Sequence, residues 1–177
     1  VSILFQQSQA PISTDAYDFV MSARHPWISR WAGPTRDDQD IVVESLSQMG
    51  LDALMHRDVN SLSGGERRRV ELAATVAQNA QTILLDEPVN HLDLHYQINL
   101  LQGALTKWRA EGRAVVMVMH DLNLAIRFSD HLLCLCGDGS ILQGETSAVA
   151  TTENLSTLLR YPLQALTLGD RSFFIPA

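Results

Sequence analysis

Residues 82–88 read TILLDEP and carry the clearest indication of the fold. The apolar run ends in two adjacent carboxylates, Asp86 and Glu87, and open α/β sheets bind ligands at the carboxyl ends of their strands. Neighbouring acids repel each other unless a cationic or protic group lies between them. A nucleotide-bound Mg²⁺ and an attacking water would meet both needs. We predict that Asp86 holds the metal through water and that Glu87 polarises the attacking water. Taken alone, these seven residues are explained about equally well by an ordinary acidic turn that ends at Pro88.

A second apolar run, residues 113–119, ends in His120 and Asp121. If the two strands are parallel, both polar ends meet at one edge of the sheet. Asp121 is explained as the N-cap of the next helix. His120 taken alone is explained by a satisfied histidine at the sheet edge. Beside the other phosphate-type signals it becomes a candidate contact for a γ-phosphate.

Residues 62–66 read LSGGE and predict the start of a helix. Ser63 at the N-cap and Glu66 three residues later form the pattern of a capping box. That reading does not explain why Gly64 and Gly65 both lie between them, because glycine weakens a helix start. Bare amides at the positive end of a helix, together with a serine hydroxyl, would bind a phosphate. We favour this anion site.

Strands and helices alternate along most of the chain, which predicts an α/β domain with a parallel sheet. The predicted helices cover residues 14–24, 35–49, 52–56, 64–79, 94–110, 121–129, 146–150 and 153–160. The predicted strands cover residues 1–5, 82–85, 113–119, 131–136, 140–143, 165–168 and 172–175. We expect three segments: the end of a core strand with its loop in 1–12, an inserted helical subdomain in 13–61, and the rest of the core in 62–177.

Composition narrows the functional classes. The 177 residues carry a formal net charge of −7, and their only basic cluster is Arg67, Arg68 and Arg69. Broad nucleic-acid binding needs a basic face, so we expect no nucleic-acid partner and read the arginines as packing and solvated surface. No apolar run approaches the ~20 residues of a membrane helix. A zinc site at Glu87, His91 and His95 is disfavoured, because Pro88 interrupts the helix that their spacing requires.

Five motifs in order resemble the ATPase domain of ABC transporters. Residues 62–70 (LSGGERRRV) resemble the signature motif, and residues 82–88 resemble the Walker B strand with its catalytic glutamate. Residues 90–93 (NHLD) resemble the D-loop, His120 the switch histidine, and Gln6 the glutamine of the Q-loop. The resemblance covers essentially the whole chain and implies a partial domain of the P-loop NTPase fold.

The resemblance also implies roles for single residues. Two such domains would enclose two ATP molecules head to tail, with Mg²⁺ bound to each nucleotide. One nucleotide-binding group would face the opposite subunit: Ser63, Gly64, Gly65 and Glu66, with Asp93 at the dimer seam. The group serving the chain's own nucleotide would be Asp86 and Gln6 toward the metal, and Glu87, His120 and Gln6 in catalysis.

A finer resemblance is to importers of iron-siderophore, haem or vitamin B12. It rests on residues 23–26 (ARHP), residues 90–94 (NHLDL), residues 120–125 (HDLNLA) and the short C-terminal tail. It implies integral membrane permease subunits as partners, which residues 6–61 would contact. It also implies an indirect partnership with a periplasmic or lipoprotein substrate-binding protein, and a peripheral place on the cytoplasmic face of a bacterial-type membrane.

The chain departs from the family in one large respect. The family has a G-x-x-x-x-G-K-[ST] loop before the Q-loop, whereas Lys107, the single lysine, has no such glycines before it. By resemblance, on the order of 70 to 80 residues are absent from the start. We expect the 177 residues alone to be inactive and to expose a sheet edge and apolar surface. Two alternatives stay open: a DNA-repair or chromosome-organising ATPase of the same superfamily, and a non-catalytic remnant.

Overall fold

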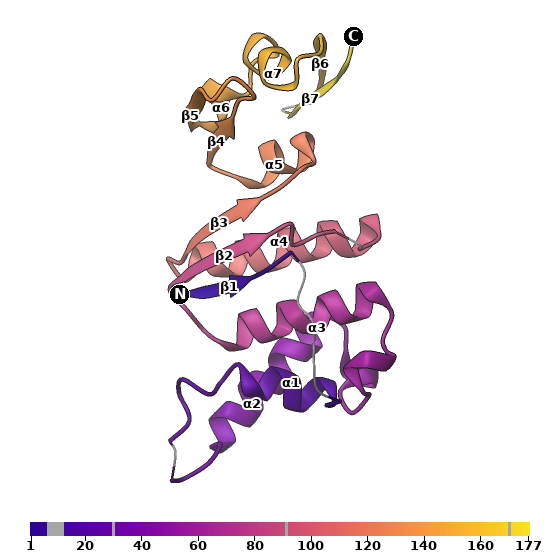
Figure 1. Ribbon diagram of the computed structural model, residues 1–177, viewed down its shortest axis with the longest axis vertical. Coiled ribbons are helices and arrows are strands. Elements are labelled where there is room, and N and C mark those ends of the chain that lie inside the picture. The colour runs from indigo at the N-terminus through magenta and orange to yellow at the C-terminus, as the bar shows by residue number, and fades with distance from the viewer. Residues whose placement is uncertain (7–12, 30, 91, 170) are drawn as a thin grey trace. The chain divides into compact units, whose positions relative to one another are not determined.

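The computed structural model describes the chain except for residues 7–12, 30, 91 and 170 (Figure 1). Its internal contacts divide it into two compact units, Val1–Val118 and Met119–Ala177. The predicted division into residues 1–12, 13–61 and 62–177 stays a prediction.

The first unit is built on a three-stranded parallel sheet with the order β1-β2-β3. The strands are β1 (Ser2–Leu4), β2 (Thr82–Asp86) and β3 (Ala114–Val118). Leu4 pairs with Leu85, and Asp86 pairs with Val118. The predicted parallel sheet is therefore confirmed, and the carboxyl ends of all three strands lie at one edge.

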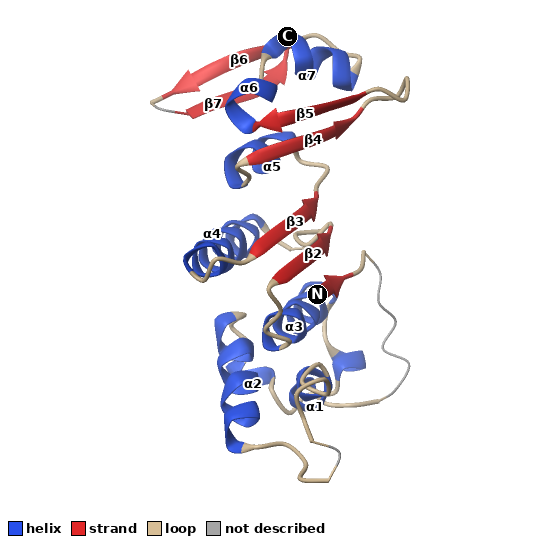
Figure 2. Ribbon diagram, turned by 90° about the vertical axis from the view of Figure 1, so that its left-hand side faces the viewer, coloured by secondary structure: helices blue, strands red, loops and turns tan. Residues whose placement is uncertain are grey.

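Two long helices lie on the same side of this sheet (Figure 2). They are α3 (Gly64–Ala77) and α4 (Leu94–Ala110), and α4 has the predicted bounds. The prediction extended α3 to residue 79, but the helix ends where Gln78 caps it and Asn79 turns to a φ of 52°. On the opposite side of the sheet Ile3, Val116 and Val118 are about half exposed, which agrees with the expected apolar surface.

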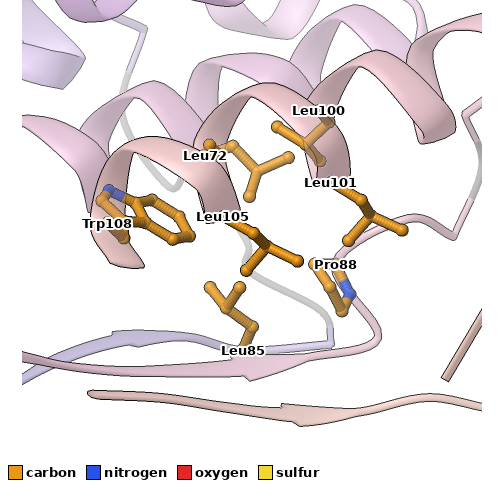
Figure 3. A pocket seen from close by; sticks show the side chains of 8 residues that line it. Leu72, Leu85, Pro88, Leu100, Leu101, Leu105 and Trp108 are labelled. Carbon is orange, nitrogen blue, oxygen red and sulfur yellow. The ribbon is translucent and has the colours of Figure 1, made fainter. Parts of the chain in front are cut away.

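The junction of α3, α4 and β2 is wholly apolar (Figure 3). The cavity there measures about 10 Å³, which is near the lower limit for a single water. Its lining residues are Leu72, Leu85, Pro88, Leu100, Leu101, Ala104, Leu105 and Trp108. This junction is therefore part of the packed core and no ligand site.

A helical segment packs against α3. It contains α1 (Ala16–Ser22), α2 (Arg36–Gln48) and two 3₁₀ turns, Asp52–Leu54 and Val59–Ser61. The second 3₁₀ turn was not predicted. Thr35 and Asp38 form a capping box at the start of α2, and Gly50 follows the helix with a φ of +63° that favours glycine.

One buried ion pair joins the helices of this segment to α3. Arg24 donates from Nε and Nη2 to Asp38 Oδ1 at 3.0 and 2.8 Å. It also donates from Nη1 to the carbonyl of Ala77 at 2.9 Å. Arg24 is 7% exposed and Asp38 4%, so each charge depends on the other for compensation.

The second unit combines two antiparallel hairpins with short helices. The hairpins pair β4 (His131–Leu135) with β5 (Ile141–Glu145), and β6 (Leu163–Leu168) with β7 (Arg171–Pro176). The helices are α5 (Leu122–Phe128), α6 (Thr146–Val149) and α7 (Thr152–Leu159). Leu155, Leu163 and Phe174 form its core. Among the residues that the structure describes, no helix is long and apolar enough to cross a membrane.

The Arg24–Asp38 junction makes stability depend on pH. Hydrogen bonds from the Thr35 side chain and backbone, with Arg24, hold the pKa of Asp38 below its ordinary value near 4. A carboxyl with a lowered pKa contributes stability that is full above the unfolded pKa and is lost as pH falls through the folded pKa. We expect Asp38→Asn to lower the melting temperature of the complete protein at pH 7, and the difference from the parent to shrink below about pH 4.

Thermal unfolding followed by circular dichroism at a series of pH values measures this difference. Asp40→Asn, on the exposed side of the same helix, is the control and should change the melting temperature little. A difference for Asp38→Asn that stays constant down to pH 3 would contradict the assignment.

Candidate functional site

Asp86 and Glu87 lie where β2 ends, as predicted. Asp86 is the last residue of the strand, and the N–H of Glu87 donates to the carbonyl of Val118 at 3.0 Å. This bond continues the pairing of β2 with β3 by one residue. Asp86 is half-buried, and Glu87 is 7% exposed. The two carboxylates are therefore presented at the carboxyl edge of a parallel sheet, where such sheets place ligands.

Glu87 adopts a backbone conformation that is unusual for its residue type. Its φ is +46°, in the left-handed region that residues with a Cβ rarely occupy. Asn90 Nδ2 donates to Glu87 Oε2, and the N–H of Asn90 donates to the Glu87 carbonyl at 3.2 Å. Strained residues of this kind persist where their surroundings fix them, and they are concentrated at functional sites. The sequence predicted neither the left-handed turn nor the contact with Asn90.

Arg68 of α3 contacts the backbone at the ends of two strands. Its Nη1 donates to the carbonyl of Phe5 at 2.7 Å. Its Nη2 donates to the carbonyls of Asp86 and Glu87 at 2.7 and 3.0 Å. Glu71 Oε2 lies 3.0 Å from Nη1 and supplies the opposite charge. Sequence reasoning read Arg68 as part of an ordinary arginine cluster, and no local pattern marked it as part of the site.

The predicted capping box at the start of α3 is confirmed. Ser63 Oγ accepts from the N–H of Glu66 at 3.3 Å, and Glu66 Oε2 accepts from the N–H and Oγ of Ser63 at 2.8 and 2.7 Å. These bonds hold the pKa of Glu66 below its ordinary value. Gly64 is exposed, and a Cβ added there would meet no atom within 4 Å. The start of α3 is thus open to a ligand on the side of Gly64.

The remaining predicted site residues lie at element boundaries. Gln6 is exposed and follows Phe5, whose carbonyl Arg68 binds beside Asp86. Asp93 is the N-cap of α4, and its Oδ1 accepts from the N–H of Tyr96 at 3.0 Å. His91 of the predicted D-loop lies outside the described residues.

His120 belongs to the second unit, directly before Asp121, which caps α5 through the N–H of Leu124 at 2.8 Å. The N-cap role of Asp121 is therefore confirmed. The expected approach of His120 to Asp86 stays a prediction.

The carboxylates at this sheet edge fit one kind of metal better than others. Within the described part of the chain, no group of three or more His, Cys, Asp and Glu residues could hold an ion by itself. Mg²⁺ needs only one or two protein carboxylates when phosphate oxygens and water complete its shell. Asp86 at the edge of the sheet suits such an ion, and Glu87 lies beside it.

Comparisons with known proteins agree on one family. The profile of the ABC transporter family matches residues 1–90. The achromobactin transport ATP-binding protein CbrD of Dickeya dadantii is 34% identical over 99% of this chain and 65% of its own length. A metal-chelate type ABC transporter solved in an inward-facing conformation superposes with a TM-score of 0.86 at 28% identity. That match covers 99% of this chain and 71% of the other.

A bacterial ABC transporter cassette solved as a dimer superposes with a TM-score of 0.71 at 27% identity, over 82% of this chain and 62% of the other. Of the curated relative CbrD, the chain spans 65% of the length, which is less than two thirds. The predicted α/β class, a P-loop NTPase fold of the ABC type with a parallel sheet, is confirmed by these structures and by the β1-β2-β3 sheet. The chain belongs to the ABC transporter family.

Proposed function

We propose that the complete protein is the ATP-hydrolysing subunit of an importer that takes up an iron-siderophore, haem or cobalamin-type compound. The observation that carries the ATPase proposal is the pair Asp86–Glu87 at the carboxyl edge of a parallel sheet in a chain of this family. The kind of cargo is supported by the names of relatives, which include ATP-binding proteins for achromobactin transport, hemin import and cobalamin import.

The chemistry follows from the positions of the two carboxylates. Glu87 would orient the attacking water and accept its proton, because its side chain is held by Asn90 and its surroundings exclude most of the solvent. Asp86 would hold Mg²⁺, which neutralises charge on the phosphates when bound. Gln6 would lie near the same ion, and His120 would contact the γ-phosphate.

A second copy would complete the site. The hydroxyl of Ser63 and the amides of Gly64 and Gly65, in the open first turn of α3, would bind the γ-phosphate of the nucleotide held by the partner copy. Glu66 holds the Ser63 hydroxyl in place, and Asp93 would lie at the seam between the copies. The dimeric cassette among the similar structures supports the pairing of two copies.

The proposal extends to partners and location. Integral membrane permease subunits would contact residues 6–61, and a substrate-binding protein would act through them. The subunit would then be peripheral, on the cytoplasmic face of the cell membrane. Lys107, the single lysine of the sequence, lies 2.9 Å from Glu44 in an ion pair.

Glu87→Gln tests the catalytic role. Losing the base should slow ATP hydrolysis by the complete protein by roughly 10²- to 10⁴-fold while ATP binding survives, because the amide keeps the size of the side chain. Phosphate release measures the rate, and equilibrium binding of a fluorescent ATP analogue measures affinity. Glu153→Gln, at an exposed carboxyl in α7, is the matched control and should keep the parent rate. An unchanged rate in Glu87→Gln would refute the assignment.

Ser63→Asp tests the shared site separately from the fold. Aspartate is as good an N-cap as serine, so α3 should still form. It loses the hydroxyl that donates to Glu66 and places a second carboxylate beside it, so the melting temperature should fall modestly. Its negative charge would repel the partner's γ-phosphate, so ATP should no longer induce a dimer in the Glu87→Gln background. Light scattering with and without ATP measures this, and Ser63→Thr, which keeps the hydroxyl, should still dimerise. A dimer in Ser63→Asp as tight as in the parent would contradict the placement.

A further inference from the structure

We propose that Arg68 is a positioning residue that holds the backbone of Glu87 in its left-handed conformation and thereby sets the rate of hydrolysis. The inference rests on the proposed function. Arg68 touches neither nucleotide nor water in this proposal, and it acts only through the residue that it holds.

The burial of Arg68 shows that its contacts are specific. It is 5% exposed, and a buried guanidinium is costly unless it is paired and hydrogen-bonded. Glu71, 9% exposed, provides the opposite charge, and carbonyl oxygens accept from Nη1 and Nη2, while the buried Nε has no hydrogen-bond partner among the described residues. A buried ion pair is weak evidence for stability, because apolar residues of similar volume often stabilise a fold as well or better. The choice of partners therefore indicates a geometric role.

The partners of Nη2 lie on both sides of the strained residue. Nη2 binds two carbonyl oxygens. One belongs to Asp86, in the peptide bond before Glu87, and the other belongs to Glu87 itself. Holding both oxygens within 3.0 Å of one atom restricts the two backbone dihedrals of Glu87 together. The N–H of Glu87 is held as well, because it donates to the carbonyl of Val118 in β3. The φ of +46° is thus held by contacts from two other elements.

The other terminal nitrogen of Arg68 contacts the residue before Gln6. Nη1 binds the Phe5 carbonyl, so one side chain joins the ends of β1 and β2 to α3. Arg68 also lies in the second turn of the helix that Ser63 begins. A movement of α3 or of the Gln6 segment would therefore be transmitted to Glu87 through a single rigid group. Lysine could not replace it, because its single ammonium lacks the planar fork that reaches separate acceptors.

The test uses Arg68→Met and Arg68→Lys in the complete protein. We expect kcat for ATP hydrolysis to fall by roughly 10- to 100-fold in both, with KM and ATP affinity within about threefold of the parent. Arg24→Met is the matched control: Arg24 is 7% exposed, pairs with Asp38 and binds the Ala77 carbonyl, outside the site. It should lose as much thermal stability as Arg68→Met and still keep the parent kcat well below its melting temperature.

If the role of Arg68 were purely structural, Arg68→Met and Arg24→Met would show the same kcat at the same loss of thermal stability. That result would overturn the proposal. If Arg68→Met does not fold, Arg68→Lys carries the test, because it keeps the charge opposite Glu71. Parent kcat in a folded Arg68→Lys would overturn the proposal as well.

A double mutant gives the sharpest outcome. If Arg68 acts only through Glu87, adding Arg68→Met to Glu87→Gln should leave the residual rate unchanged within about threefold. A further 10-fold loss would mean that Arg68 acts elsewhere. Failure of the proposed function gives a different result, because Glu87→Gln alone would then retain the parent rate.

Discussion

Parallel pairing of β2 with both of its neighbours is the constraint on which the first unit depends. Parallel strands cannot be joined by tight turns, so the chain must leave the sheet after each strand and return through a crossover. The helical segment, α3 and α4 occupy those crossovers, and α3 and α4 cover one side of the sheet. The same pairing brings Asp86 beside Val118, so the carboxyl ends of β2 and β3 share one edge.

Buried arginines connect α3 to the sheet and to the helical segment. Arg24 ties α1 and α2 to the end of α3, while Arg68 ties α3 to the ends of β1 and β2. Arg69 donates to the carbonyls of Met49 and Gly50 from the same helix. Burying each of these charges costs free energy, and directional hydrogen bonds to backbone oxygens offset that cost. As a result α3 is bonded to the helical segment and to the ends of β1 and β2, beside Gln6, Asp86 and Glu87.

Local signals in the sequence predicted most elements correctly. The bounds of α4 were predicted correctly, because the signals that begin and end a helix act within a few residues. The same holds for the capping box at Ser63. The predictions were wrong at the final turn of α3 and missed the 3₁₀ turn Val59–Ser61. At both places packing against other elements outweighs the local preference of the sequence.

The sequence by itself determined the order of strands and helices, the motifs and hence the family, because capping, periodicity and motif spacing are properties of neighbouring residues. It could not distinguish the three consecutive arginines, of which Arg67 remains 30% exposed in its side chain while Arg68 and Arg69 are buried. Tertiary structure alone decided that Arg68 meets Phe5 and Glu87 and that Glu87 turns to a positive φ. These features arise from contacts between residues far apart in the chain, and only the parallel sheet brings those residues together.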